Sequence, residues 1–442
     1  MKQITKPSRL ARAAMLAMLG LAAVPLHAAV TNLTWKADLT VKETFDDNVY
    51  LQNYAPPSTM PDAVPAKKSS WVTTVTPRVA LDDQLCSGFK ASLSYAPDVA
   101  VYHNAPSEDN TTHRAGLTFK GAAGDTVWEQ ANAFTYIDGS HYGPIFGRPP
   151  QDVPAIGGIP LRDRRAAFIY RGGFKLTWTL DRFFIRPVAS AYVHDFQTVQ
   201  RLGATPTGAY YENYLDRQDV NGGVDIGYDV GKKTFLVLGY RYGRQDQFIG
   251  PNAAGTDLTD SPYDSSYHRI LFGVEGSPAK WIKVAALGGP EIRDWADGTY
   301  AGFDRNRLDY WVDASVTLMP DKNDAVTLLF RRFTQPAFSS QSIYDDITYS
   351  ATWKHTFNAH LSASAGMQLY IGDWQAPVNR NDWIYTPSAG LTYIFNKHFS
   401  AEAACSSDWV ENKIPTTAPG AKYAEGRKFT RQLVSLSLKC AF

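Results

Sequence analysis

The residue types that usually carry chemistry are present in this sequence, but they are not grouped as enzymes and metal sites group them. The nine histidines are scattered singly, and neither an HExxH pair nor a glycine-rich phosphate loop leading into a helix occurs. Cys86, Cys405 and Cys440 are too few for a disulfide framework and form no cluster. We therefore expect no catalytic residue, no cofactor and no bound metal.

Charged residues form a more informative pattern, because they recur at every second position of segments whose other positions are apolar. Both signs are interspersed, as in the charged walls that set selectivity in membrane channels. The main candidates for such a wall are Lys36, Asp38, Arg241, Arg269, Glu291, Arg293, Arg307, Asp309 and Asp313. A salt-bridged filling that only stabilises the fold would use the same residues. Which side of the molecule they face depends on the elements that carry them.

Those elements are predicted to be strands. In the segment 308–318, Leu308, Tyr310 and Val312 share one parity, whereas Asp309 and Asp313 share the other. A period of two places alternate side chains on opposite faces of a strand, and a helix would need a period of 3.6. The alternations run for about 10 to 14 residues, close to the length of a tilted membrane-spanning strand. We count about 18 such segments, with 16 as the alternative, and an even number is usual for bacterial barrels.

The predicted connections alternate in length. Short turns are expected at 277–280, 320–323, 358–359 and 396–398, and long polar segments at 44–70, 138–164, 246–264 and 411–427. Short turns on one side and long loops on the other are typical of outer-membrane barrels. In lipid a sheet must close on itself to pair its backbone groups. The sequence therefore predicts an all-β, antiparallel, up-and-down transmembrane barrel, with its apolar parity facing lipid and its polar parity lining a lumen.

The first 28 residues have the plan of a secretory signal peptide. A basic head that includes Lys2 and Arg12 precedes the apolar run "AAMLAMLGLAAVPL", and Ala28 follows as a small cleavage-site residue. The run is shorter than the roughly 20 residues that a spanning helix needs. We expect a signal peptide at 1–28 and an outer-membrane barrel at 29–442.

The chain ends in a strictly alternating segment, "VSLSLKCAF". Its apolar parity resembles the C-terminal assembly signature of bacterial outer-membrane barrels, in which the insertion machinery reads the final aromatic residue. The matching positions are Val434, Leu436, Leu438, Cys440 and Phe442. Cys440 departs from the pattern, which more often has a larger apolar residue there. The resemblance implies outer-membrane lipid and the barrel-assembly machinery as partners.

Three further segments resemble the start of the β-barrel porin-2 family. They read "LTVKETFDDNVYL" at Leu39–Leu51, "SSWVTTVTPRVAL" at Ser69–Leu81 and "ASLSYAPDVAVY" at Ala91–Tyr102. With the alternating tail, the likeness covers essentially the whole chain after residue 28. It implies an outer-membrane barrel that in some members is associated with exopolysaccharide export, and it names no solute.

Barrel size favours a passive channel for small hydrophilic solutes, because 16 to 18 strands leave an aqueous lumen whereas about eight do not. The segment 138–164 is expected to fold into the barrel mouth, where it would narrow the channel with Arg148, Asp152, Arg162 and Asp163. A loop that packs over the rim or against a neighbouring subunit is the alternative for this segment. A structural or export-associated barrel is the alternative, and an outer-membrane hydrolase is a further one. The nearly balanced charge, formally +1, argues against a nucleic-acid partner. Association into a homo-oligomer is left open.

Overall fold

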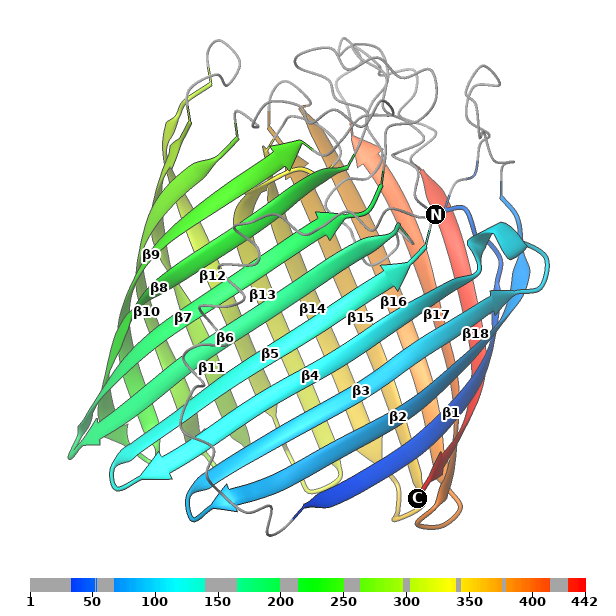
Figure 1. Ribbon diagram of the computed structural model, residues 1–442, viewed down its shortest axis with the longest axis horizontal. Coiled ribbons are helices and arrows are strands. Elements are labelled where there is room, and N and C mark those ends of the chain that lie inside the picture. Colours follow the sequence, from blue (N-terminus) through cyan, green and yellow to red (C-terminus); the bar gives the residue numbers. More distant parts are fainter. Residues whose placement is uncertain are drawn as a thin grey trace.

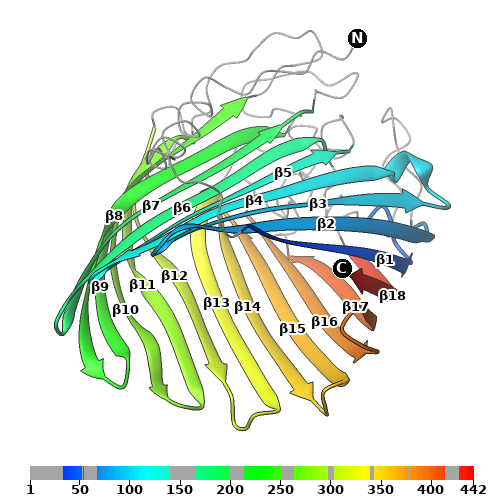
Figure 2. The ribbon, with the colours of Figure 1, turned by 60° about the horizontal axis from the view of Figure 1, so that its bottom comes forward.

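The computed structural model describes residues 33–51, 53, 67–139, 165–198, 214–249, 263–296, 303–338, 343–375, 379–413 and 428–442. One sheet of 18 antiparallel strands follows the chain order, and β1 pairs with β18, so that the sheet closes into a barrel (Figures 1 and 2). The predicted fold class and strand number are confirmed. The predicted signal peptide lies outside the described residues.

The strands are long and similar in length. Their bounds are β1 (Thr34–Asp46), β2 (Ser70–Cys86), β3 (Phe89–Tyr102), β4 (Asn110–Ala123), β5 (Thr126–Asp138), β6 (Ala167–Leu180), β7 (Phe183–Phe196), β8 (Leu215–Gly231), β9 (Thr234–Ile249), β10 (Ser265–Ala279), β11 (Ile282–Trp295), β12 (Asn306–Leu318), β13 (Asp324–Pro336), β14 (Ile343–Thr356), β15 (Leu361–Trp374), β16 (Arg380–Ile394), β17 (Phe399–Lys413) and β18 (Phe429–Ala441). A short 3-10 helix, η1 (Pro106–Glu108), connects β3 to β4. None of the described helical structure is long and apolar enough to cross a membrane.

The two ends of the barrel differ in the length of their connections. The turns at the end that holds the C-terminus, called here the short-turn end, are short and comprise 87–88, 124–125, 181–182, 232–233, 280–281, 319–323, 357–360 and 395–398 (Figure 1). The opposite end, called here the long-loop end, carries connections such as 47–69, 139–166 and 414–428. The predicted alternation is therefore present. The turn predicted at 277–280 is misplaced, because β10 continues to Ala279 and the chain reverses at 280–281.

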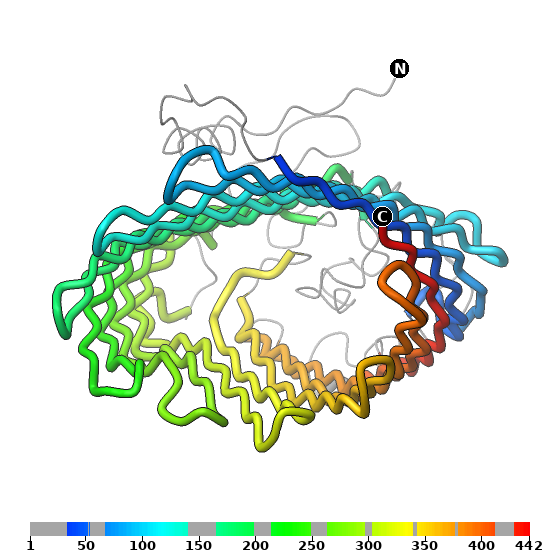
Figure 3. Tube along the Cα trace, turned by 90° about the horizontal axis from the view of Figure 1, so that it is seen from below, coloured from blue at the N-terminus to red at the C-terminus, as the bar shows by residue number. Residues whose placement is uncertain are grey.

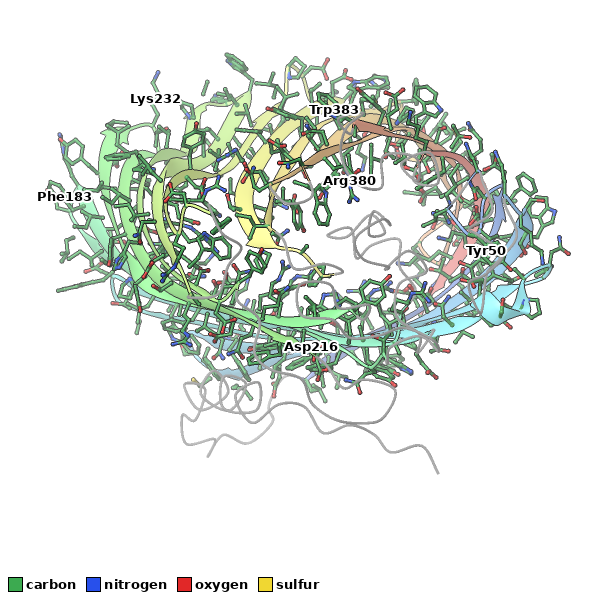
Figure 4. All side chains as sticks on the ribbon, turned by 90° about the horizontal axis from the view of Figure 1, so that it is seen from above. Tyr50, Phe183, Asp216, Lys232, Arg380 and Trp383 are labelled. Carbon is green, nitrogen blue, oxygen red and sulfur yellow. The ribbon has the colours of Figure 1, made fainter. Side chains whose placement is uncertain are left out.

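Side-chain parity separates an apolar outer face from a polar inner face. On β18, Val434, Leu436 and Leu438 point outward and are 55%, 57% and 58% exposed. Phe183 on β7 likewise points away from the barrel, whereas Arg380 on β16 points into it (Figure 4). Closing the sheet pairs the backbone groups of every strand within the protein, which is what a hydrocarbon environment requires.

The barrel is flattened in cross-section (Figure 3). Strands β2–β6 lie along one long side and β13–β17 along the facing side, while β7–β11 turn round a narrow end. The upper parts of β13 and β14, drawn in yellow, leave the wall and project into the interior. Accordingly, the ladder between β12 and β13 stops at the pair Val312–Arg332, although β12 continues to Asn306 and β13 to Pro336.

Candidate functional site: the inner face of the barrel

The inner face of β1–β6 carries more basic than acidic side chains, and we call it the basic wall. Its eight basic residues are Lys36, Lys42, Arg78, Lys90, Arg114, Lys120, Arg171 and Lys175, and its five acidic residues are Asp38, Asp46, Asp82, Asp98 and Glu129. All eight basic residues are exposed, whereas none of the five acidic residues is. The cationic groups therefore reach into the interior, and the shorter carboxylates lie close to the sheet.

Ion pairs across neighbouring strands organise this wall. The Arg114 guanidinium on β4 contacts Asp98 on β3, and its side chain stays 52% exposed. The ammonium groups of Lys120 and Lys175 flank Glu129 on β5 at 3.1 and 3.0 Å. Glu129 is shared between two lysines that are 59% and 56% exposed, so one positive charge in this triplet is left over. Pairs as exposed as these contribute little to stability, typically about 0–1 kcal/mol. Their charges remain available to water and solutes.

The facing inner surface, on β14–β17, is rich in small hydroxyl side chains, and we call it the hydroxyl wall. Its serines and threonines are Thr348, Ser350, Thr352, Thr356, Ser362, Ser364, Thr386, Ser388, Thr392, Ser400 and Ser406. Lys354 and Glu402 are its exposed charged residues. The Arg380–Asp382 pair, by contrast, has side chains only 0% and 1% exposed. The two long sides of the lumen thus differ in accessible charge.

The narrow end holds a second kind of charged arrangement, which is buried. Glu291 on β11 accepts hydrogen bonds from Arg269 on β10 and from Arg293 on its own strand. Arg293 also donates to Gln245 Oε1 at 2.6 Å and to Ser265 Oγ at 3.0 Å. The side chains of Glu291 and Arg293 are 2% and 1% exposed. These residues form a salt-bridged filling of the barrel wall.

A neighbouring ionic group extends this filling toward the short-turn end. Arg186 on β7 makes two hydrogen bonds to the Glu275 carboxylate at 2.8 and 2.9 Å and contacts Asp225 at 3.0 Å. Arg241 on β9 contacts the other Asp225 oxygen at 2.7 Å. Gly239 makes room for this group, since a Cβ atom there would lie 2.5 Å from Asp225 Oδ1. Small residues on the wall therefore allow charged side chains to pack tightly across it.

Residues 336–338, at and just beyond the end of β13, lie across the interior and bind the opposite wall. The Leu215 amide donates to the Phe338 carbonyl at 2.7 Å, and Arg217 Nη1 donates to the Pro336 carbonyl at 3.1 Å. Gln247 on β9 donates to the Ala337 carbonyl at 2.5 Å. The Phe338 ring packs with Ala167, Phe196 and Tyr214, at the upper ends of β6 to β8. We call residues 333–338 with 343–346 the inner hairpin; near the long-loop end it crosses from the wall of β13 and β14 to the upper ends of β6 to β9.

Arg332 spans the gap that the inner hairpin leaves in the wall. Its Nη1 donates to the Tyr310 carbonyl of β12 at 2.7 Å, and its Nη2 donates to Asp345 at 2.8 Å. The guanidinium also lies over the Tyr310 ring, 4.4 Å from its centroid. In this gap the Arg332 side chain replaces the main-chain hydrogen bonds that would otherwise join β12 to β13.

The predicted lumen residues fall into these different surroundings. Lys36 and Asp38 belong to the basic wall, and Asp313 forms an exposed pair with Arg331 at 3.3 Å. The other six lie at the narrow end, where four belong to the buried ionic groups and the last two, Arg307 and Asp309, pair with each other at 3.2 Å. That set is Arg241, Arg269, Glu291, Arg293, Arg307 and Asp309.

The predicted constriction residues Arg148, Asp152, Arg162 and Asp163 lie outside the described residues. The element that the structure does place inside the barrel, the inner hairpin, was not predicted. Its sequence signal is the apolar pair Ala337–Phe338 between Pro336 and two serines, in a connection too short to stand out as a loop.

Four of the five predicted assembly residues, Val434, Leu436, Leu438 and Cys440, lie on the outward parity of β18. Phe442 follows the strand, is 70% exposed, and its amide donates to the Ala37 carbonyl at 2.8 Å. Cys440 is paired opposite Leu39 and is half-buried. The last residues thus lie at the seam where the first and last strands close the barrel.

Within the described residues, no group of three or more histidine, cysteine, aspartate or glutamate side chains is placed to hold a metal ion. His355, on the apolar parity of β14, contacts Asp324 at 2.9 Å. The same Asp324 oxygen accepts a hydrogen bond from Trp353 at 2.7 Å. This contact links the strand ends of β13 and β14 near the short-turn end.

A closed antiparallel sheet with an even number of strands, an apolar exterior and a charged interior is an outer-membrane β-barrel. Residues 302–442, less than half of the chain, match a family model described as "Putative MetA-pathway of phenol degradation". This is not the porin-2 family, and that resemblance stays a prediction. A comparison with curated proteins gives no significant match.

Several solved outer-membrane barrels are remotely similar. OccAB3 of Acinetobacter baumannii is 11% identical, with a TM-score of 0.41 and coverage of 92% of this chain and 99% of that chain. The outer membrane protein OpdK of Pseudomonas aeruginosa is 10% identical, with a TM-score of 0.43 and coverage of 92% and 99%. The siderophore receptor PirA of the same organism is 7% identical, with a TM-score of 0.41 and coverage of 94% and 81%. Similarity this remote does not identify the solute of the present chain.

Proposed function

We propose that this protein is a porin-like channel through which small hydrophilic solutes diffuse across the outer membrane. The observation that carries the proposal is the exposure of the basic wall. Its charged groups occur from Lys36 and Lys90 near the short-turn end to Arg114 and Arg171 in the other half of the barrel. Charges that stay exposed along the inside of a barrel require water there, since dry burial of an unpaired charge is costly.

The size of the barrel supports the same function. Barrels of 16 to 18 strands are too wide for side chains to fill, so an aqueous path remains. Here the buried ionic groups fill the narrow end, and the inner hairpin crosses the lumen near the long-loop end. The path for solutes then lies between the basic wall and the hydroxyl wall.

Solute flux into proteoliposomes tests the proposal. Protein folded into vesicles should admit sugars and small organic acids, including aromatic acids, at rates that fall with solute size. The control is protein-free vesicles of the same lipid, prepared in the same way. Vesicles that stay sealed although the protein is folded and heat-modifiable would contradict a channel, and would favour the structural or export-associated alternative.

A further inference from the structure

The accessible charge inside the barrel is predominantly positive. The eight basic residues of the basic wall are all exposed, and its five acidic residues are buried or half-buried. On β18, which adjoins β1, Lys439 adds another cation that is 42% exposed and contacts Asp38 at 3.3 Å. The buried ionic groups at the narrow end scarcely reach the lumen, so their charges count little there.

Three lysines of the basic wall are not neutralised by a partner. In the described part of the chain, Lys36, Lys42 and Lys90 make no ion pair, whereas Arg78, Arg114, Lys120 and Lys175 each have a carboxylate partner. Lys36 and Lys90 lie near the short-turn end, and Lys42 lies further along β1 toward the long-loop end. Their positive charges therefore act at more than one level of the lumen.

The hydroxyl wall offers no matching excess of negative charge. Its exposed charges, Lys354 and Glu402, cancel. Its other inward carboxylates, Asp346, Asp382 and Asp408, are buried, and Asp382 is paired with the buried Arg380. An ion that passes between the two walls thus meets fixed positive charge on one side and neutral hydroxyl groups on the other. Because the Debye length is about 8 Å at physiological ionic strength, the basic wall acts on ions that pass within about that distance of it.

We propose that the channel selects small anions, and that the unpaired lysines of the basic wall set this preference. The inference rests on the proposed channel function and adds the class of solute to it. Anions such as chloride and small carboxylates are attracted to the basic wall and pass, whereas cations are repelled from it. Solutes with hydroxyl groups as well as a carboxylate find hydrogen-bond partners on the facing wall.

The reversal potential in a planar bilayer under a potassium chloride gradient tests this inference. The unmodified protein should show a reversal potential of the sign that chloride permeation gives, and gluconate in place of chloride should still carry current. The variant K36Q/K42Q/K90Q should shift the reversal potential toward the equilibrium potential of potassium. The matched control K232Q/K280Q/K397Q removes three exposed lysines from turns at the short-turn end and should leave the potential nearly unchanged.

The outcomes separate this inference from the channel function. A conducting protein that prefers potassium would overturn the anion selectivity while the channel function stands. Equal shifts from the lumen triple variant and the turn triple variant would overturn the role of the lysines. A folded protein that conducts no ions would overturn both proposals together.

Discussion

At the scale of single residues, the same side-chain types have different roles according to their exposure. Asp38 and Glu291 both accept ion pairs from two basic residues on the inner face. The Asp38 side chain is 16% exposed beside partners that are about half exposed, whereas Glu291 and Arg293 are almost fully buried. Breaking a buried pair leaves an uncompensated charge, which is far more costly than losing an exposed pair.

We therefore expect Glu291→Gln to destabilise the folded barrel by about 3–5 kcal/mol, because Arg269 and Arg293 lose their shared carboxylate. Asp38→Asn is the matched control and should cost no more than about 1 kcal/mol. Urea-dependent folding into lipid vesicles measures both values. Similar small losses at the two sites would mean that the narrow end is hydrated and not packed.

The orientation of adjacent residues can be tested in the same way. Met367 and Gln368 lie side by side near the middle of β15; Met367 faces outward, and Gln368 shares the inward parity of Tyr370. Met367→Arg places a charge in lipid and should cost about 2–4 kcal/mol near the membrane midplane. Gln368→Arg faces water and should be nearly neutral. A reversed order of the two free energies of unfolding would show that the inner and outer faces have been exchanged.

At the scale of elements, the inner hairpin is held by hydrogen bonds to its main-chain carbonyls. Arg217 and Gln247 supply two of the donors, and the Leu215 amide supplies the third. The bonded carbonyls belong to residues 336–338, so a shortened hairpin that lacks these residues loses the three bonds to the opposite wall. The pairing of β12 with β13 below Arg332 should stay intact.

Replacing residues 336–343 by a short Gly/Ser turn should therefore raise single-channel conductance, since it removes the element that crosses the lumen. A deletion of residues 142–160 tests the separate prediction that the segment with Arg148 and Asp152 narrows the mouth. Heat-modifiability shows whether each variant has folded. Unchanged conductance in a folded hairpin variant would mean that the solute path does not pass the inner hairpin.

The terminal strand carries another prediction. Phe442 lies on the lipid-facing parity at the seam of the barrel, and its position resembles the signal read by the assembly machinery. Removing Phe442 should leave most of the protein in the periplasm, as measured by fractionation of expressing cells. Phe442→Tyr, which keeps an aromatic side chain, should restore insertion. Full outer-membrane levels without any terminal aromatic would contradict this role.

At the scale of the whole molecule, the sequence predicted the architecture but not its asymmetry. Alternation in segments such as Leu308–Leu318 is a local property. The number of strands, the closure of the sheet and the side to which each side chain points could therefore be predicted from it. Lys36 and Arg293 share the polar parity of their strands, yet one is exposed and the other is buried. That difference depends on the curvature of the sheet and on strands far apart in the chain, which no local pattern reports. The contact between Phe338 and Leu215 was hidden for the same reason.

The flattened shape gives each part of the wall a separate role. The narrow end is packed with paired charges, and the inner hairpin crosses the lumen near the long-loop end. The two long sides of the flattened barrel (Figure 3) carry the basic wall and the hydroxyl wall. This division predicts that stability resides mainly at β7–β12 and that conduction depends mainly on β1–β6 and β14–β17.

The central claim is that an aqueous path runs through the barrel, and single-channel recording tests it most directly. Purified, folded protein added to a planar bilayer in potassium chloride should give stepwise increases in current, each of the same size. Neutral polymers small enough to enter should reduce the step, and larger polymers should not. A bilayer that takes up the folded protein, as shown by its recovery from the membrane, yet stays insulating would contradict the account.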